Sequence, residues 1–375
     1  MAMEKTYRID FETLERFMRE VFEKSGVPAA DAAICADVLI TADKLGIDSH
    51  GIGRLKPIYY DRIKAGIQQP VTRFEIVRES PTTAVIDGHD GMGQVIARQA
   101  MQLAIDKAKQ YGMGMTAVRN STHYGIAGYY ALMAAEHGMI GMTGTNARPS
   151  IAPTFGVENM LGTNPLTFGM PTDEPFPFLL DCATSISQRG KIEVYARAGR
   201  ELPPGWVIGE DGRTRTDTEQ ILIDLVKGKA ALTPLGGIGE EHGGYKGYGY
   251  ATVVEILSAA LQQGSFLKGL LGFNADDSKR PYHLGHFFLA INIECFTGLD
   301  SFKKTAGDIL RELRASRRAP GQPHIYTAGE KEYLNYQRRL KEGVPVNPAL
   351  QKNIRTLVAE LDLKGYDFEF LQEQE

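Results

Sequence analysis

The sequence has few cysteines, no excess of basic residues and no long hydrophobic run, and each absence excludes a class of protein. Its three cysteines, Cys35, Cys182 and Cys295, lie far apart without CxxC or Cys/His spacing. That argues against a disulfide scaffold and against a structural zinc site, and we expect no bound metal. The 42 basic and 46 acidic residues give a net charge of −4, so we expect neither a nucleic-acid partner nor binding to an anionic membrane.

Hydrophobic segments that would target or anchor the chain are also missing. No apolar run approaches the roughly 20 residues of a membrane-spanning helix. The opening Met-Ala-Met-Glu-Lys-Thr lacks the apolar core of a signal peptide. We therefore expect a cytoplasmic protein in a reducing compartment. Because 375 residues exceed the usual size of one hydrophobic core, two packed lobes are expected.

Helical patterns occupy both ends of the chain. Apolar residues recur at helical spacing near the N-terminus and again in three segments near the C-terminus. The predicted helices cover residues 10–25, 31–45, 301–316, 330–341 and 347–363. We expect both termini to form one helical lobe, residues 1–73 plus 312–375, beside a central α/β lobe of residues 74–311.

The central region begins with a βαβ-like unit. Strands are predicted at residues 74–78, 83–88 and 115–119, and a helix over 94–109 joins the last two. Units of this kind often bind dinucleotides, but the loop Gly91-Met92-Gly93 lacks the third glycine of the fingerprint. No acidic residue ends the following strand either. The sequence therefore predicts an α/β fold without a standard Rossmann loop.

Two later segments of the central region have a distinctive composition. Prolines, glycines and charges over residues 199–219 predict an excursion on the surface. The segment from Tyr250 to Gln262 is rich in apolar residues, which predicts a buried helix.

Three clusters of polar residues could support chemistry. The stretch Ser49 to Arg54 joins two predicted helices. A histidine there could move a proton near neutral pH, and an arginine could clamp a carboxylate. Asn120 to His123 lies at a strand-to-helix junction, and Asp181 to Ser185 follows an apolar strand. A helix cap is the alternative for each cluster, together with a surface ion pair for the first.

Several familiar catalytic patterns are missing. No GxSxG nucleophile elbow is present, and His283 and His286 lack the HExxH context of a zinc hydrolase. Lys246 opens a predicted helix within a glycine-rich loop, where it could bind a phosphate or carboxylate or simply be solvated.

An ordered set of motifs resembles the malate/L-lactate dehydrogenase type 2 family, whose members are NAD(P)-dependent oxidoreductases unrelated to the Rossmann-type lactate and malate enzymes. The motifs are Ser49-His50-Gly51-x-x-Arg54-Leu55, Asn120-x-x-His123-x-Gly125-x-Ala127-Gly128-Tyr129, Gly162-Thr163-Asn164-Pro165, Asp181-x-Ala183-Thr184-Ser185, Lys246-Gly247-Tyr248-Gly249 and Gly329-Glu330. The resemblance covers almost the full length, and the ordered set is far more specific than any single motif.

The resemblance implies a family-specific, non-Rossmann α/β fold with a mixed central sheet, a homodimer and a substrate cleft between lobes. It also implies reversible hydride transfer between a nicotinamide cofactor and a small 2-hydroxy acid. Members act on malate, lactate, sulfolactate, ureidoglycolate or diketogulonate, and one branch reduces cyclic imines. From overall likeness we expect malate and oxaloacetate with NAD, and the choice between NAD and NADP stays open. A non-catalytic binding protein is the alternative from another class.

The resemblance also assigns roles to residues of the site. The catalytic histidine of the family matches His50 in some members and His123 in others. We expect His50 to move the proton, with His123 as the second candidate, and Asp181 to position a histidine or the cofactor amide. Substrate contacts are expected from Ser49, Arg54 and Arg148, the last as a second cation for a dicarboxylate.

The expected cofactor contacts come from five segments of the chain. They are Thr122, His123, Thr145, Asn146, Ala147, Leu180, Asp181, Cys182, Ala183, Tyr245, Lys246, Ala328, Gly329 and Glu330. Cys182 stands where methionine is common in the family and Thr122 where asparagine is common. Neither departure indicates the substrate.

Overall fold

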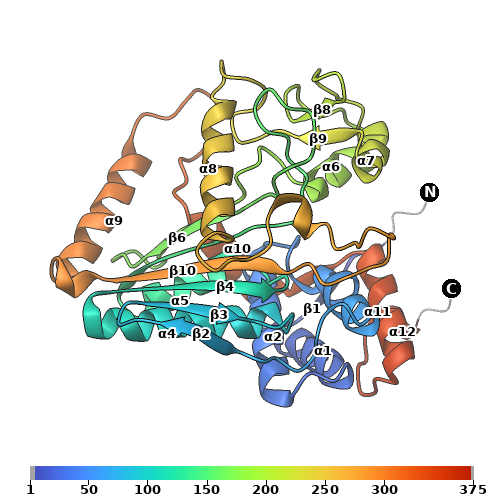
Figure 1. The fold of residues 1–375 in the computed structure, drawn as a ribbon, viewed down its shortest axis with the longest axis horizontal. Helices are drawn as coiled ribbons and strands as arrows, with labels where there is room; N and C mark the ends of the chain where they lie inside the picture. The colour runs from blue at the N-terminus through green and yellow to red at the C-terminus, as the bar shows by residue number, and fades with distance from the viewer. Residues whose placement is uncertain (1–4, 373–375) are drawn as a thin grey trace.

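The computed structural model describes residues 5–372 and confirms a mixed α/β fold around a central sheet (Figure 1). In this part of the chain seven strands pair in the order β2-β3-β4-β10-β5-β6-β7. They are β2 (Glu75–Glu79), β3 (Thr83–Asp87), β4 (Met113–Ser121), β5 (Met139–Thr145), β6 (Leu166–Met170), β7 (Phe178–Cys182) and β10 (Leu284–Asn292). The pair β3 and β4 is parallel and the other five pairs are antiparallel.

Helices flank the sheet and form the ends of the chain. They are α1 (Phe11–Lys24), α2 (Ala29–Lys44), α3 (Asp61–Lys64), α4 (Gly93–Tyr111), α5 (Ala127–Glu136), α6 (Arg189–Arg197), α7 (Thr218–Lys227), α8 (Gly244–Leu257), α9 (Leu299–Ala315), α10 (Glu330–Glu342), α11 (Pro348–Leu361) and α12 (Glu369–Gln372). Two short turns, η1 (Ile52–Arg54) and η2 (Leu55–Tyr60), lead into α3. The predicted βαβ unit is confirmed as β3, α4 and β4.

A row of small residues lets two helices approach one face of the sheet closely. Gly114, Ala290, Gly141 and Gly169 are successive partners across β4, β10, β5 and β6, so they share a face. A Cβ on Gly141 or Gly169 would lie 2.6 Å from the carbonyl oxygen of Ala131 in α5. A Cβ on Gly114 would similarly collide with α4. Both helices therefore cover this face, and larger side chains would push them away.

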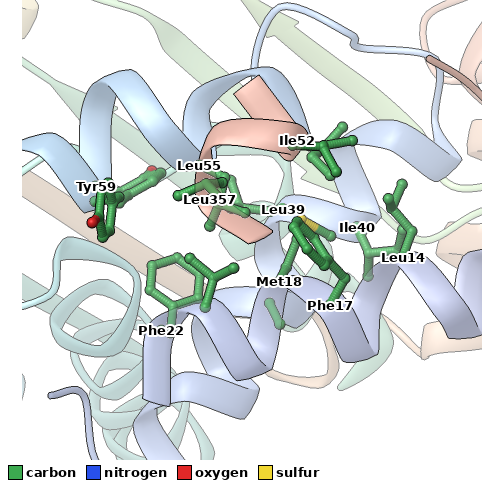
Figure 2. Packing of buried hydrophobic residues seen from close by; sticks show 14 of the residues in the cluster. Leu14, Phe17, Met18, Phe22, Leu39, Ile40, Ile52, Leu55, Tyr59 and Leu357 are labelled. Carbon is green, nitrogen blue, oxygen red and sulfur yellow. The ribbon is translucent and has the colours of Figure 1, made fainter. Parts of the chain in front are cut away.

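Residues from both ends of the chain share one hydrophobic core. Leu357 of α11 packs among Phe17 and Phe22 of α1 and Leu39 of α2 (Figure 2). A two-stranded sheet also joins the two ends of the chain, because β1 (Tyr7–Ile9) pairs with β11 (Val344–Val346). These strands of three residues are too short for their periodicity to be detected in the sequence. The lobe boundaries at residues 73 and 312 stay a prediction.

The expected surface excursion over residues 199–219 is wrong. The segment includes the buried strand β8 (Val207–Gly209), which pairs with β9 (Ala230–Leu232). Together with α6 and α7 these strands enclose a small core of their own. The prolines, glycines and charges of the loops outnumber the few apolar residues of the strand, which explains the misleading composition.

The expectation of a buried helix at residues 250–262 is also wrong. Helix α8 begins earlier, at Gly244, and only one side of it packs inward, through Ala251 and Val254. On its opposite side Tyr250, Val253 and Ile256 are about half exposed. An apolar sequence predicts burial, but it does not say whether the covering surface belongs to the same chain.

Candidate active site

A cavity of about 860 Å³ lies where the helical lobe meets the carboxyl ends of β4, β5 and β7. That volume falls within the range of small-molecule sites. The lining includes His50, His123, Thr145, Asn146, Ala147, Asp181, Cys182, Ala183, Gln188, Lys191 and Glu332. The structure thus brings the three predicted polar clusters to one cavity.

The turn that presents His50 is built around a buried carboxyl group. Asp43, near the end of α2, accepts a hydrogen bond from the backbone N–H of Ile52 at 2.8 Å. Gly51 lies against the same group, and a Cβ there would be 1.8 Å from Asp43 Oδ1, so no other residue fits. Burial raises the pKa of Asp43 to about 8, and the charge of Asp48 adds to the shift. The carboxyl group is therefore neutral at pH 7.

The C-terminal part of the chain clamps the same turn. From α10, Arg339 donates through both terminal nitrogens to the carboxylate of Asp48, with Nη2 3.0 Å from Oδ2. Its Nη1 also donates to the backbone carbonyl of Asp43 at 2.6 Å. The side chain of Arg339 is almost fully buried. A bidentate arginine pair fixes direction as well as distance, so α10 holds the turn before His50 in place.

The two candidate histidines lie face to face. Their ring centroids are 5.6 Å apart with an angle of 18° between the planes. Burial lowers the pKa of His50 to about 4, with a smaller effect from the charge of Arg54. Burial also holds the pKa of His123 well below its ordinary value, aided by the charges of His50, Arg62 and Arg54. Both imidazoles are therefore neutral at pH 7.

Hydrogen bonds determine which nitrogen of His123 bears the proton. The backbone N–H of Gly125 donates to His123 Nδ1 at 3.2 Å, and the hydroxyl of Tyr59 lies 2.7 Å from the same atom. A nitrogen that accepts an N–H bond has no proton of its own, so the proton of neutral His123 is on Nε2. His50 Nδ1 lies 2.8 Å from the hydroxyl of Ser49, which can donate or accept. When His50 Nδ1 is the donor to Ser49, the Nε2 atom of His50 has a free lone pair that can accept a proton.

The charges of Arg54 and Arg62 reach His123, although no arginine of the described residues lines the cavity. Arg54 donates from Nε to the backbone carbonyl of Ser49, which leaves its terminal nitrogens available. Arg148 is exposed, and within residues 5–372 it forms no hydrogen bond or ion pair. The charges of Arg54 and Arg148 both lower the pKa of Arg62, although its own burial has the larger effect. Anionic groups of a small molecule would be attracted to this end of the site.

Asp181 organises the opposite wall. Its Oδ2 accepts from the backbone N–H of Gly128 at 2.7 Å, in the first turn of α5, and its Oδ1 accepts from the hydroxyl of Thr167 at 3.0 Å. Burial raises the pKa of Asp181, while these two hydrogen bonds oppose the shift. The structure shows no contact between Asp181 and either histidine of the pair. Asp181 joins β6, β7 and α5 around the cavity.

Three predicted cofactor residues use their side chains inside the protein. The hydroxyl of Thr122 donates to the carbonyl of Gly91 and accepts from the N–H of Gly93. The amide of Asn146 accepts from the N–H of Gly285 and donates to the carbonyl of Ser265. The hydroxyl of Thr145 likewise contacts buried partners. Thr145 and Asn146 line the cavity and Thr122 does not, so a ligand would meet mainly the backbone of residues 145 and 146.

His286, which lacks the HExxH context of a zinc hydrolase, lies beneath this wall and supports it. Its Nδ1 lies 2.7 Å from the hydroxyl of Thr145 and its Nε2 lies 2.8 Å from that of Ser121. The ring also stacks on Tyr124 at a centroid distance of 4.5 Å. Burial lowers the pKa of His286 to about 3, so it is neutral and structural. Its partners are more than 100 residues away, so no local pattern indicates them.

The N-terminus of α6 is a feature of the cavity that the sequence analysis missed. Gln188 and Lys191 both line the cavity, and the N-cap Gln188 makes no capping hydrogen bond with its side chain. The first N–H groups of the helix, together with the lysine ammonium, form an environment that suits an anion such as a pyrophosphate. No sequence motif marks Lys191.

Two predicted cofactor segments lie next to the cavity rather than in it. Tyr245 and Lys246 line a separate hollow of about 600 Å³ at the start of α8. Leu235 of that hollow donates its backbone N–H at 2.8 Å to the carbonyl of Thr184, the residue that follows Ala183 of the cavity. Residues 328–330 lie against the start of β7, and the carboxylate of Glu330 binds His324 and Thr327 instead of facing the histidine pair.

Comparison with known proteins decides the family. A sequence profile described as malate/L-lactate dehydrogenase matches residues 9–355. The chain belongs to this family. A malate dehydrogenase of Pyrococcus abyssi is 45% identical over 97% of this chain and 98% of its own length. An L-sulfolactate dehydrogenase of Methanocaldococcus jannaschii is 39% identical over 95% and 98%. The crystal structure of malate dehydrogenase from Entamoeba histolytica superposes with a TM-score of 0.93 at 45% identity, covering 96% of this chain and 99% of that one.

Membership of this dehydrogenase family confirms that the protein is an oxidoreductase for 2-hydroxy acids that uses a nicotinamide cofactor. The solved structures of malate dehydrogenases from Entamoeba histolytica and Pyrococcus horikoshii share the fold of this chain. Across residues 5–372 no helix is long and apolar enough to span a membrane. In the same residues no group of three or more His, Cys, Asp or Glu side chains is placed to hold a metal ion.

Two variants test the neutral carboxyl group of Asp43. Asp43→Asn keeps an oxygen that can accept the Ile52 N–H, so kcat/KM for reduction of a 2-keto acid should stay within about threefold of wild type. Asp43→Leu leaves that N–H without a partner, at a cost of about 1–3 kcal/mol, and should lower kcat/KM by about tenfold or more. An Asn variant as inactive as the Leu variant would show that the negative charge is needed.

Ionisation of the same carboxyl group makes the stability of the wild type depend on pH, while Asp43→Asn lacks this dependence. A raised folded-state pKa means that the stabilisation by neutral Asp43 is complete at low pH and is lost as the pH rises toward about 8. Asparagine does not ionise. The melting temperature of Asp43→Asn should therefore exceed that of wild type at about pH 9 but not at about pH 5. An equal difference at both pH values would contradict the assignment.

Proposed function

We propose that this protein is an NAD-dependent malate dehydrogenase that interconverts L-malate and oxaloacetate. The observation that supports the proposal most directly is the neutral His50–His123 pair at the wall of the cavity, with arginines beside it. The names of the relatives at 42–45% identity support malate as the substrate. The L-sulfolactate relative makes sulfolactate the second candidate, because its sulfonate would also suit the arginines.

His50 is the proposed base. When malate is oxidised, a bound nicotinamide supplies the acceptor for the hydride that leaves C2. The hydroxyl proton must pass to a group with a free lone pair, and His50 Nε2 has one when its Nδ1 donates to Ser49. His123 has its proton on Nε2 and would donate a hydrogen bond to the same substrate oxygen. His50 can accept the proton and His123 can donate this hydrogen bond only as neutral rings of the stated tautomers, and their low pKa values keep both rings neutral.

The proposed substrate contacts place the anionic groups of malate on arginines. Arg54 has its terminal nitrogens available and would bind the C1 carboxylate with two parallel hydrogen bonds. Ser49, adjacent to His50, would orient the substrate hydroxyl or the imidazole. Arg148 is the second cation that the sequence suggested, at the exposed edge of the same cluster.

The residues of the cavity fit a dinucleotide. The first turn of α6 and Lys191 would hold its pyrophosphate, and the backbone of residues 145–147 and 181–183 would flank the nicotinamide end. Tyr245, Lys246 and residues 328–330 would contact the parts that extend beyond the cavity. Among the described residues Lys191 is the one lysine or arginine that lines the cavity, so no second cation is present there for the extra phosphate of NADP, which supports NAD.

We also propose that the protein is a cytoplasmic homodimer. Two thiols, Cys182 and Cys295, are exposed and free, as is usual in a reducing compartment. The apolar ridge of α8 formed by Tyr250, Val253 and Ile256 lies beside an apolar hollow of about 500 Å³. A ridge next to a hollow can pair with the same surface of a second copy about a two-fold axis.

Light scattering coupled to size-exclusion chromatography tests the dimer. Wild type should have twice the mass of the chain, and Ile256→Glu should elute as a monomer because the partner surface cannot accommodate a charge. Val226→Glu is the matched control, since Val226 is similarly exposed but lies on α7. A monomeric wild type, or a dimeric Ile256→Glu variant, would contradict this interface.

Substitution of each histidine tests the proposed chemistry. Wild type should consume NADH with oxaloacetate, and the absence of turnover with any 2-keto acid would contradict the function. His50→Gln should lower kcat by about 100- to 10,000-fold, the usual contribution of a general base. His123→Gln should mainly weaken substrate orientation and lower kcat less. If His123→Gln abolishes turnover while His50→Gln does not, the two roles are reversed.

A further inference from the structure

Arg62 is a cation near the reacting histidines to which the mechanism above gives no role. It belongs to α3, which continues the helical segment that starts at Leu55. Tyr59 precedes it by three residues and therefore lies on the same side of the helix. Since the hydroxyl of Tyr59 contacts His123 Nδ1 at 2.7 Å, Arg62 extends from the helical face that meets the histidine pair.

An aromatic ring fixes the orientation of Arg62. Its guanidinium carbon lies 4.3 Å from the centroid of the Tyr282 ring. Tyr282 stands two residues before Leu284, which lines the cavity. Stacking holds the plane of a guanidinium but leaves its N–H edges free, so Arg62 is oriented without being neutralised.

The N–H groups of Arg62 have no acceptor within the described chain. Between residues 5 and 372 it forms no hydrogen bond and no ion pair, although it is only partly exposed. By comparison, Lys64 on the same helix binds the carboxylate of Glu360 at 2.7 Å. A partly buried guanidinium without a carboxylate is costly unless a ligand supplies the anion.

Arg62 is also part of a group of three arginines that act on one another. Burial lowers the pKa of Arg62, and the charges of Arg148 and Arg54 lower it further, while Tyr282 and Tyr59 oppose the shift. Three like charges within interaction distance repel each other, and an anion bound among them would remove that repulsion. One carboxylate on Arg54 still leaves two cations for a second anionic group.

We propose that Arg62 is a specificity-determining residue that binds the C4 carboxylate of a four-carbon dicarboxylate, while Arg54 binds the C1 carboxylate. This inference rests on the malate function proposed above and names the residue that distinguishes a dicarboxylate from a 2-keto acid with an uncharged end. Arg148 is exposed and no aromatic ring orients it within residues 5–372, and Lys246 lines a separate hollow at the start of α8.

The test compares two substrates that differ only at C4. Oxaloacetate has a carboxylate there, whereas 2-oxobutyrate has a methyl group. For Arg62→Gln, kcat/KM for oxaloacetate should fall about 10- to 150-fold, mainly through KM, because a charge-assisted hydrogen bond to the ground state is lost. For 2-oxobutyrate it should change less than about threefold. Arg62→Lys should give an intermediate loss, because it keeps the charge without the planar stack.

Lys64→Gln is the matched control, since Lys64 is on the same helix and pairs with Glu360 away from the cavity. It should leave both substrates unaffected. An equal loss on both substrates for Arg62→Gln would show that Arg62 only supports the fold, and no loss on either would exclude it from the site. A wild type that does not prefer oxaloacetate over 2-oxobutyrate would instead overturn the malate function, and with it this role.

Discussion

The site depends on holding His50, which belongs to the helical lobe, against His123, which follows a strand of the central sheet. The neutral buried carboxyl group of Asp43 accepts the backbone N–H of Ile52, and Arg339 donates to the backbone carbonyl of Asp43. The N-terminal and C-terminal helices share one core, so the clamp joins distant parts of the chain. Without this constraint the imidazole pair would have no defined geometry.

The surroundings of His50 and His123 explain why both rings stay neutral although arginines lie near them. Cations and burial both disfavour imidazolium, so the two rings stay neutral where an exposed histidine would begin to protonate. The same cations attract an anionic substrate, whose carboxylates would then offset part of this effect. One set of charges therefore binds the substrate and keeps the base unprotonated.

The sequence predicts much of this arrangement, but not its long-range parts. The βαβ unit, the helical ends and the stretch from Ser49 to Arg54 follow from local patterns. Arg62 and Lys191 belong to no sequence motif. Their roles depend on residues that are distant in the sequence and become neighbours only in the folded chain. The buried strand β8 was hidden by the composition of its loops, and the exposed side of α8 by its apolar sequence.

The pH dependence of kcat/KM for malate oxidation tests the central claim most directly, namely that burial keeps the proton-accepting imidazole neutral. A folded-state pKa of about 4 for His50 leaves the base free at every higher pH. The rate constant should therefore stay level from about pH 8 down to about pH 5.5 and decline only at lower pH. A decline centred near pH 6.5, the ordinary value of an exposed imidazole, would contradict the account.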